Sequence, residues 1–340
     1  SARSAIGLGI ATPISGAGGN RRACTGFEVT TVSESGAVVS QIQSVQNIAG
    51  DLRGRIENFA RGPKTFAGLA LARPLIMGIV NVTPDSFSDG GEHDTTESAI
   101  AHGHTLLEHG AVILDVGGES TRPGAQPVDP ETEMNRIIPV IRALSESGAV
   151  VSADTRHVAT MDEAIKVGAK IINDVTGLRD PAARTLIAKT GLSVIIMHMK
   201  GEPRTMQTDP RYVWAPGDIF DVLAKNVEEC AAAGIARERI AIDPGIGFGQ
   251  NDLHIAQVLD HIGMLHEIGH TVVLGASRKA FVGRWSTGEQ PKGRVAGSIA
   301  AALCGNLNGV QILRVHDVAE TRQALAVAGR IADSGDQNSG

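Results

Sequence analysis

Aromatic residues are scarce in this 340-residue chain, where Phe, Trp and Tyr together make up 3%. A surface that stacks single-stranded nucleic acid needs aromatic rings, so this composition argues against such a partner. The formal net charge of −6 extends the argument, because nucleic-acid phosphates attract basic proteins. We therefore expect no nucleic-acid partner.

Cysteine is also rare, with Cys24, Cys230 and Cys304 as the three copies. They are odd in number, widely separated, and lack the spacing of a metal site. A framework of disulfides is therefore excluded, and we expect a cytoplasmic protein whose thiols stay reduced.

No long apolar run is present. The strongest stretch, FAGLALARPLIMGIVNV, is interrupted by Arg73 and Pro74, whereas a membrane helix needs about 20 consecutive apolar residues. We expect no membrane association. The first 26 residues combine Arg, Ser and Ala without an acid, as transit peptides do, but their many glycines favour a disordered leader.

What the chain does contain is a repeated pattern between Leu75 and Asp317: a short apolar run stops at a polar residue and a helix-like stretch follows. Such runs, rich in Val and Ile, fit strands buried on both faces of a parallel sheet. Eight of them predict a closed (β/α)₈ barrel, in which the strand ends meet at one rim. The polar stops are Asn81, Glu119, Asp154, Asn173, His198, Asp243, Ser277 and His316.

The pattern divides the chain into an N-terminal extension (1–72), a barrel (73–333) and a short tail (334–340). In the extension, two β-prone runs around a Ser-Glu-Ser-Gly turn predict a hairpin within 26–40, and a weaker strand pair is expected at 65–71. In the barrel, start signals and 3.6-residue periodicity predict the helices. The expected ranges are 94–109, 129–146, from 180, 216–233, 252–267, and from about 294 and 317.

Four of the rim residues suit a flat heterocycle that carries N–H donors and ring acceptors. Asp154 and Asp243 can each accept two parallel N–H bonds, and the amide of Asn173 can both accept and donate hydrogen bonds. Lys279 can donate from the opposite side. The alternative is that each carboxylate caps the helix that follows it. For one residue the two interpretations are equally good, whereas their convergence on one rim favours ligand binding.

Cations gather at the same rim of this acidic protein: Arg122, Arg278, Arg314 and His316. Such a cluster predicts a small anion, of which phosphate or pyrophosphate is usual in barrels. Surface ion pairing is the alternative, and it fits Arg278 best. Arg314 and His316 are two residues apart on one strand and so share a side.

Two Gly-bounded loops carry charged residues and are expected to close over reactants. The first, NVTPDSFSDGG, holds Asp85 and Asp89, and the second, GGESTRPGAQPV, holds Thr121, Arg122 and Pro123. The MHMKG stretch suggests a packed His198 in preference to a metal ligand. GIGFG lacks the third glycine of a dinucleotide fingerprint and is rejected as one.

Several of these stretches together resemble the dihydropteroate synthase family, folate-pathway enzymes that sulfonamides inhibit. The resemblance covers 73–333 in order and spacing. Its motifs are MGIVNVTPDSFSDGG (77–91), LDVGGESTRPGA (114–125), SADT (152–155), IINDVTG (171–177), IMHMKG (196–201), IDPGIGFG (242–249), GASRKAFVG (275–283) and ILRVHD (312–317). The first two and the Ser-Arg-Lys turn are highly specific.

The resemblance implies a role for each matching residue. Pterin contacts fall on Asp154, Asn173, Val175, Met197, Asp243, Phe248, Gly275, Lys279 and Arg314. The pyrophosphate site falls on Asn81, Thr121, Arg122, Arg314 and His316, with Asn81 also matching a Mg²⁺ contact. p-Aminobenzoate contacts fall on Phe87, Thr121, Arg122, Pro123, Phe248, Ser277 and Lys279. Catalytic roles fall on Asp89, Arg122, Asp154, Asp243 and Lys279.

The implied transferase joins p-aminobenzoate to 7,8-dihydropterin pyrophosphate, and the family is typically a homodimer. The helix RVAGSIAAALCGNL has small residues suited to close packing.

Two positions depart from the family: Ala153 replaces a larger aliphatic residue, and Gln250 replaces a Lys.

Two other functions remain open. A pterin-dependent corrinoid methyltransferase shares the barrel and the ring-binding acids, but Arg314, His316 and the Thr121-Arg122-Pro123 loop count against it. A non-catalytic pterin-binding paralogue is the other alternative, although the chain retains the loop residues named above.

Overall fold

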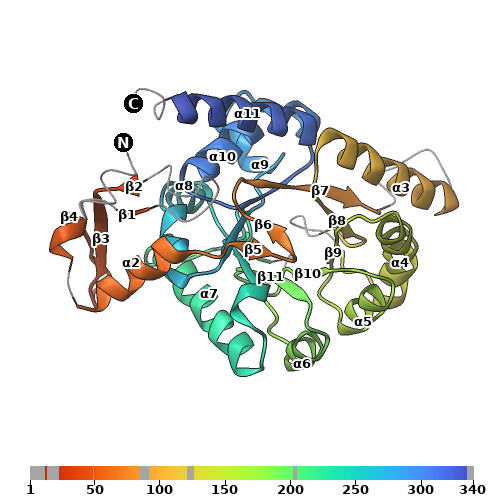
Figure 1. The fold of residues 1–340 in the computed structure, drawn as a ribbon, viewed down its shortest axis with the longest axis horizontal. Helices are drawn as coiled ribbons and strands as arrows, with labels where there is room; N and C mark the ends of the chain where they lie inside the picture. The colour runs from red at the N-terminus through yellow and green to blue at the C-terminus, as the bar shows by residue number, and fades with distance from the viewer. Residues whose placement is uncertain are drawn as a thin grey trace.

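The computed structural model describes residues 12–13, 23–48, 50–83, 92–120, 126–201 and 205–334. Its centre is a closed barrel of parallel strands surrounded by helices, which confirms the predicted fold (Figure 1). The strands are β7 (Leu75–Asn81), β8 (Ile113–Gly117), β9 (Val151–Asp154), β10 (Ile171–Asp174), β11 (Ser193–Met197), β12 (Ile240–Asp243), β13 (Thr271–Leu274) and β14 (Ile312–Val315).

The barrel helices follow the strands in the expected alternation. They are α3 (Glu92–His109), α4 (Pro130–Glu146), α5 (Val158–Lys166), α6 (Pro181–Thr190), α7 (Ala215–Ala232), α8 (Asp252–Asp260), α9 (Ala280–Trp285), α10 (Val295–Leu307) and α11 (Val318–Ser334). Two start signals act as predicted. Asp129 accepts from the backbone N–H of Thr132, and Asp180 accepts from that of Ala182.

One helix prediction is wrong. The segment expected to run as a single helix from 252 to 267 breaks after Asp260, and the 3₁₀ helix η5 (Ile262–Ile268) follows. Ile262 and Leu265 are both buried there. Residues three apart share one side of a 3₁₀ helix, so the tighter winding keeps both of them in the core.

A small antiparallel pair closes the amino end of the barrel. β5 (Thr65–Phe66) pairs with β6 (Leu69–Ala70), which confirms the weaker strand pair expected at 65–71. Phe66 and Leu71 are buried against Met77, Ile113 and Ile171 inside the barrel. Because this end is filled with apolar side chains, the carboxyl end is left for polar groups.

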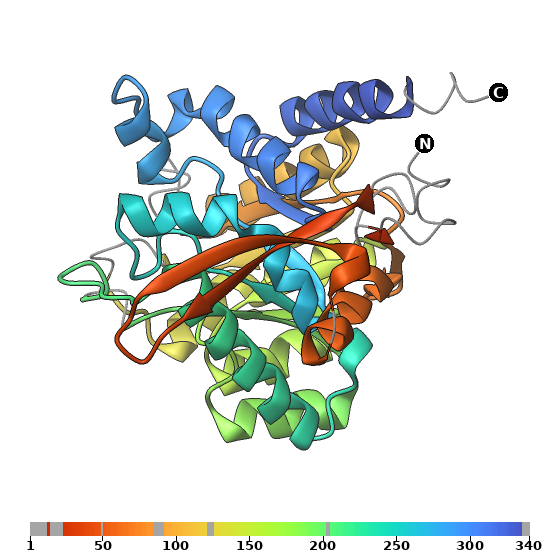
Figure 2. The same cartoon turned by 90° about the vertical axis from the view of Figure 1, so that its left-hand side faces the viewer.

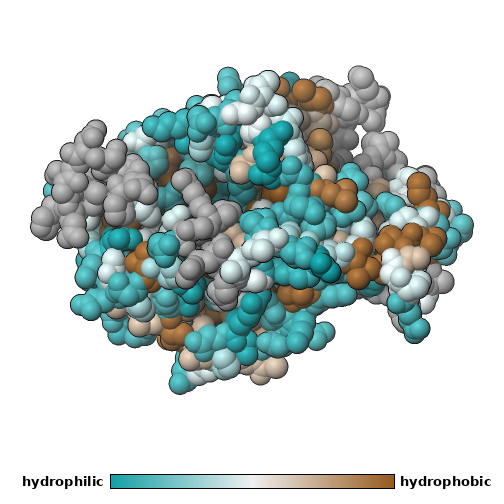
Figure 3. All heavy atoms as spheres, turned by 180° about the vertical axis from the view of Figure 1, so that it is seen from behind, coloured by the Kyte–Doolittle hydropathy of each residue, from teal (hydrophilic) through white to brown (hydrophobic). Residues whose placement is uncertain are grey.

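The N-terminal hairpin is also present. β3 (Gly26–Val32) pairs with β4 (Val38–Ser44), and Figure 2 shows the pair lying across the outside of the helical layer. Helix α2 (Asp51–Arg61) connects it to the barrel. Figure 3 shows hydrophobic residues gathered at the edge that carries the hairpin, where Val39 and Ile42 are 64% and 85% exposed.

Phe59 of α2 lies between the hairpin and the barrel. Its ring centroid is 5.3 Å from that of Phe27 and 5.8 Å from that of His266, both edge to face. Nearby, Arg55 forms an ion pair with Glu267 at 2.6 Å. The extension is therefore fixed to η5 by aromatic and charged contacts.

The glycines of α10 allow close packing, as their sequence suggests. A Cβ on Gly297 would lie 2.4 Å from Cγ1 of Val282, and one on Gly305 would lie 2.5 Å from Cδ2 of Leu274. These small residues let α10 approach α9 and β13 of its own chain. None of the described helices is both long and apolar enough to cross a membrane.

Candidate active site

Strand register brings three of the predicted residues to adjacent positions. Asn81 on β7 pairs with Gly117 on β8, Gly117 with Asp154 on β9, and Asp154 with Asn173 on β10. A Cβ on Gly117 would lie 3.3 Å from that of Asp154 and 3.4 Å from its Oδ2. Such a contact is tighter than ordinary packing, so glycine leaves room for the Asp154 carboxylate between its neighbours.

Arg314 enters this layer from β14 and joins two carboxylates. Its Nε donates to Oδ2 of Asp115 at 2.5 Å, and its Nη2 donates to Oδ2 of Asp154 at 2.6 Å. Asp115 also accepts from Nδ2 of Asn173 at 3.1 Å. Asp154 therefore bonds to a cation and does not cap the following helix.

Asp115 is the functional-site residue that our sequence interpretation missed. It lies inside the apolar run VILDVGG, and only the polar end of that run was considered. The available signal was an acid inside an apolar run, two residues before Gly117, because alternate residues of a strand share one side. The structure shows that this carboxylate is fully buried. Its Oδ1 is buried and has no hydrogen-bond partner among the described residues.

The electrostatics of this group are dominated by burial and by like charge. Burial, and then the negative charge of Asp115, raise the pKa of Asp154, while the adjacent guanidinium of Arg314 opposes the shift and favours the carboxylate. Burial disfavours the charge on Arg314, but Asp115 and Asp154 outweigh it and raise the pKa of the guanidinium. The guanidinium thus neutralises a pair of acids that would otherwise repel each other.

A second acid ends β12, and its cation lies on the turn between β13 and α9. Oδ1 of Asp243, on β12, accepts from the backbone N–H of Gly245 at 2.7 Å within the turn that follows, but the next helix, α8, is capped by Asn251, so Asp243 does not cap it. Burial raises the pKa of Asp243, and the positive charge of Lys279 counteracts it. Burial lowers the pKa of Lys279 to about 8, against the opposing effect of Asp243.

Lys279 is held by two further contacts. Its ammonium donates to the carbonyl oxygen of Ile246 and lies 4.7 Å from the ring centroid of Phe248. Phe248 in turn packs against a buried apolar cluster formed by Val175, Met197, Met199 and Met206. The site therefore has a charged floor beside an apolar wall, which suits a flat, polar ring.

Gly275 lies between the two acid–base groups. A Cβ there would be 3.7 Å from Cδ of Arg314 and 3.7 Å from Oδ2 of Asp243. The glycine thus adjoins both halves of the floor, which agrees with its predicted position in the pocket.

The Ser-Arg-Lys turn is built around an unusual backbone. Arg278 has a φ of +57°, a conformation that non-glycine residues rarely adopt. Its N–H donates to Oγ of Ser298 at 2.8 Å, and its guanidinium binds both oxygens of Asp317. A strained backbone conformation persists where surrounding contacts fix it. Here the fixed residue is Arg278, and Ser277 and Lys279 are its two neighbours in the chain.

These contacts decide between the two interpretations of Arg278. It forms an ion pair with Asp317 and is not a free cation of an anion site. His316 has different contacts. Its ring Nδ1 lies 3.1 Å from Oγ of Ser277, and its backbone N–H donates to the same hydroxyl at 3.2 Å. Ser277 and His316 are therefore side by side at the rim.

Two of the eight polar stops make other contacts, contrary to the simple expectation of one shared pocket. Glu119 accepts from Nε and Nη2 of Arg156, both at 3.0 Å, and from the N–H of Val128. His198 lies 3% exposed behind β11. Burial, and then the charges of Arg179 and Lys200, lower its pKa to about 4, so it is neutral near pH 7, as expected of a packed histidine.

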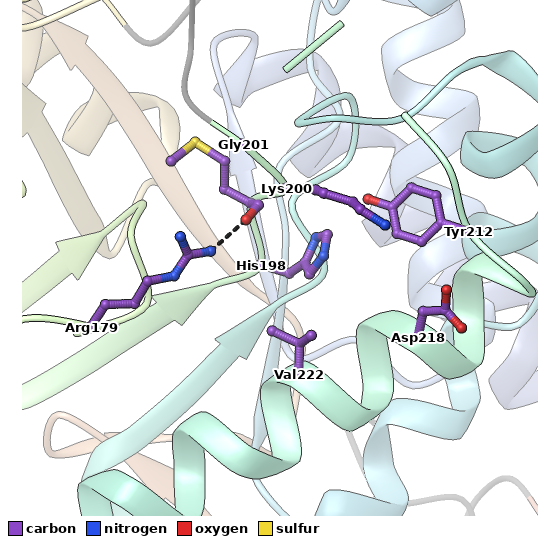
Figure 4. A pocket seen from close by; sticks show the side chains of 8 residues that line it. Arg179, His198, Lys200, Gly201, Tyr212, Asp218 and Val222 are labelled. Atoms are coloured by element: carbon purple, nitrogen blue, oxygen red, sulfur yellow. Dashed lines mark hydrogen bonds between the residues drawn. The ribbon is translucent and has the colours of Figure 1, made fainter. Parts of the chain in front are cut away.

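His198 lines a cavity of about 220 Å³ between the end of β11 and α7 (Figure 4). Arg179 donates to the carbonyl oxygen of Met199 across it at 2.5 Å. None of the predicted ring-binding residues lines this cavity. The candidate floor lies elsewhere, where Arg314 bonds to Asp115 and Asp154.

Gln250, one of the two departures from the family pattern, holds the turn 244–250. Its Oε1 accepts from the N–H of Gly247, and its Nε2 donates to the carbonyl oxygens of Pro244 and Gly245. It is 2% exposed. The neutral side chain therefore fixes the backbone beneath Phe248 and does not face the rim as a Lys would.

Five of the predicted residues, Phe87, Asp89, Thr121, Arg122 and Pro123, lie outside the described residues. Asn81 ends β7 and is half-buried. Its amide oxygen is a hard donor of the kind that Mg²⁺ accepts. One such oxygen fits an ion held mainly by substrate phosphates and water, as Mg²⁺ commonly is.

Comparison with known proteins identifies the family. The model of the pterin binding enzyme family matches residues 77–316. The dihydropteroate synthase of Escherichia coli (strain K12) is 42% identical over 270 residues, which cover 79% of this chain and 94% of that enzyme. The chain belongs to the dihydropteroate synthase family.

Solved structures of the same family agree with the fold. The structure of Xanthomonas albilineans dihydropteroate synthase with 4-aminobenzoic acid is 45% identical, with a TM-score of 0.74, and the match covers 78% of this chain and 96% of that one. The structure of the Yersinia pestis dihydropteroate synthase with a sulfonamide drug is 43% identical, also with a TM-score of 0.74, over 78% and 96%.

Proposed function

We propose that this protein catalyses the condensation of p-aminobenzoate with 6-hydroxymethyl-7,8-dihydropterin diphosphate, releasing pyrophosphate and giving 7,8-dihydropteroate in folate biosynthesis. The observation that carries this proposal is the convergence of Asp154, Asn173, Asp243, Lys279 and Arg314 on one floor. Family membership adds the reaction. The corrinoid methyltransferase alternative loses ground, because the reported relatives are dihydropteroate synthases.

In the proposed reaction, the bond between the pterin methylene carbon and the diphosphate oxygen breaks, and the aniline nitrogen of p-aminobenzoate takes its place and loses a proton. The aniline nitrogen is already nucleophilic, so no side-chain nucleophile is needed. Asp154 and Asp243 would stabilise positive charge that develops on the pterin methylene, because buried carboxylates act strongly in a low-dielectric site. We infer a dissociative displacement. Isotope effects that require a concerted displacement would contradict it.

Asn81, His316 and Arg314 would bind the diphosphate at the rim. Mg²⁺, when bound, would neutralise charge on the departing pyrophosphate, with Asn81 as one oxygen ligand. Phe87, Asp89, Thr121, Arg122 and Pro123 remain assigned by resemblance alone to loop closure and to the p-aminobenzoate and pyrophosphate sites. Chelation with EDTA should abolish turnover, and added Mg²⁺ should restore it.

One assay tests the proposal. Purified protein is mixed with Mg²⁺, dihydropterin diphosphate and p-aminobenzoate, and pyrophosphate release is measured together with dihydropteroate. Stoichiometric formation of both products supports the synthase. Tight binding of the pterin without product would instead support a non-catalytic pterin-binding protein.

Sulfonamide inhibition follows as part of the same proposal, supported by the Yersinia pestis complex. We also propose a cytoplasmic homodimer. Cysteine usage supports the compartment, and the exposed apolar residues Leu307, Val327 and Ile331 of α10 and α11 support a contact between copies. Light scattering after size exclusion would give a monomer mass if the dimer proposal is wrong.

A further inference from the structure

We propose that Asp115 is a positioning residue for the pterin site: it holds Arg314 by Nε while the guanidinium moves off Asp154 to admit the ligand, and it fixes the orientation of the Asn173 amide. This inference rests on the proposed function. It concerns a residue that is fully buried and reaches both partners from β8.

Arg314 itself occupies a hydrogen-bonding position of the proposed pterin site. Nη2 of Arg314 occupies Oδ2 of Asp154 at 2.6 Å. A carboxylate oxygen can accept two hydrogen bonds, but a ligand N–H that approaches along the direction of Nη2 reaches this oxygen after the guanidinium gives up its place. Binding is therefore an exchange of one donor for another at Asp154.

Asp115 keeps the arginine in the site during this exchange. Nε of Arg314 lies 2.5 Å from Oδ2 of Asp115, and this contact uses a different nitrogen from the one that binds Asp154. A guanidinium presents several donors in a fixed plane. The Nη groups can therefore rotate away from Asp154 while Nε stays bonded to Asp115. The guanidinium plane then lies beside the pterin ring.

The side-chain amide of Asn173 can face the pocket in either of two orientations. Donation from Nδ2 to Asp115 at 3.1 Å selects one of them, because a carboxylate can only accept. Oδ1 is then the atom left to accept from an amino-substituted ring. Oδ2 of Asp115 thus positions two predicted pterin contacts, Asn173 on β10 and Arg314 on β14.

The charge of Asp115 also acts on Asp154. The charged groups that act on Asp154 are Asp115 from β8, Arg314 from β14, Glu133 from α4 and Asp174 from β10. After burial, Asp115 contributes most to raising the pKa of Asp154. Removing this charge should lower that pKa, which a purely structural substitution would not do.

Two variants test the proposal. Asp115→Asn keeps the shape but removes the negative charge that holds the guanidinium, so we expect the KM for dihydropterin diphosphate to rise about tenfold or more. The KM for p-aminobenzoate should stay unchanged. The acid limb of the pH profile of kcat/KM for the pterin substrate should move to lower pH. Asp115→Glu keeps the charge but shifts the carboxylate, so it should raise the same KM without moving the limb.

A double-mutant cycle with Arg314→Lys completes the test. If Asp115 acts through Arg314, the effects of the two substitutions on the KM for the pterin substrate are less than additive. Full additivity, or a pterin KM within twofold of wild type in both Asp115 variants, would overturn the proposal. If Asp115→Asn does not fold, as judged by circular dichroism, Asp115→Glu carries the test.

Calorimetric titration of wild-type protein with dihydropterin diphosphate, without p-aminobenzoate, separates this inference from the proposed function. Absence of binding would contradict the function itself. Wild-type binding with unchanged affinity in both variants would contradict only the role of Asp115.

Discussion

Nη2 of Arg314 donates to Oδ2 of Asp154 at 2.6 Å, so the carboxylate that we assign to the substrate is paired with a cation of its own chain. Paired in this way, two buried charges avoid the cost of isolation in a low-dielectric interior. The same pairing makes Asp154 specific for a ligand whose donors can replace a guanidinium.

Replacing Asp154 by Asn should impair function more than folding. The amide keeps the size of the side chain and removes the repulsion with Asp115, but it loses a charged acceptor. We expect kcat/KM for dihydropterin diphosphate to fall about 10- to 100-fold. The melting temperature should stay close to that of wild type.

The matched control for this variant is Asp162→Asn, whose carboxylate is exposed on α5 and pairs with Lys166. Its activity should equal that of wild type. An unchanged rate in Asp154→Asn would remove Asp154 from the mechanism.

The charge on Lys279 predicts how activity depends on alkaline pH. Burial lowers its pKa to about 8, so the ammonium is present below that pH and is lost above it. A neutral amine donates more weakly to a ring carbonyl. We therefore expect kcat/KM for the pterin substrate to decline above about pH 8.

Lys279→Arg provides the comparison, because a guanidinium does not lose its proton in this range. The variant should have a lower rate and no decline between pH 8 and 9. A decline at the same pH in both proteins would assign the titration to another group.

Phe59 should be important for stability and unimportant for chemistry. It is 8% exposed and joins Phe27 of the hairpin to His266 of η5. Phe59→Ala should lower the free energy of unfolding by roughly 2–4 kcal/mol, since it deletes a large packed ring.

Urea denaturation measures this effect, and Ile42→Ala is the control. Ile42 is 85% exposed on the hairpin, so its truncation should change stability by less than about 0.5 kcal/mol. Equal effects of the two substitutions would show that the extension does not pack as described.

His266 should make the fold sensitive to mild acid. Burial lowers its pKa to about 4, while its unfolded value is near 6.5. Between these values the unfolded chain binds the additional proton, so the free energy of unfolding decreases as pH falls from 6.5 to 4. Each pH unit corresponds to about 1.4 kcal/mol for one such group.

His266→Gln should therefore show a flatter pH dependence of stability in this range than wild type. His104→Gln, at an exposed position of α3, should leave the dependence unchanged. Parallel curves for wild type and His266→Gln would mean that another group controls the acid response.

The arrangement of strands and most of the floor could be predicted from the sequence because they depend on local patterns. Buried parallel strands appear as apolar runs, and parallel topology brings their carboxyl ends to one rim. Asp154, Asn173 and Asp243 each end such a run, so their proximity followed from the fold. The break after Asp260 could not be predicted, because both helix types bury residues at intervals of three or four.

What only the tertiary structure decided is which side each polar residue takes and which partner it finds. Asp115 was hidden within an apolar run, and its partner Arg314 lies 199 positions away in the chain. Glu119 and His198 follow strands as the floor residues do, yet Glu119 binds Arg156 and His198 lines a separate cavity. A strand's alternation fixes which residues share a side, but the direction of that side and the contacts across it depend on the register of the closed barrel.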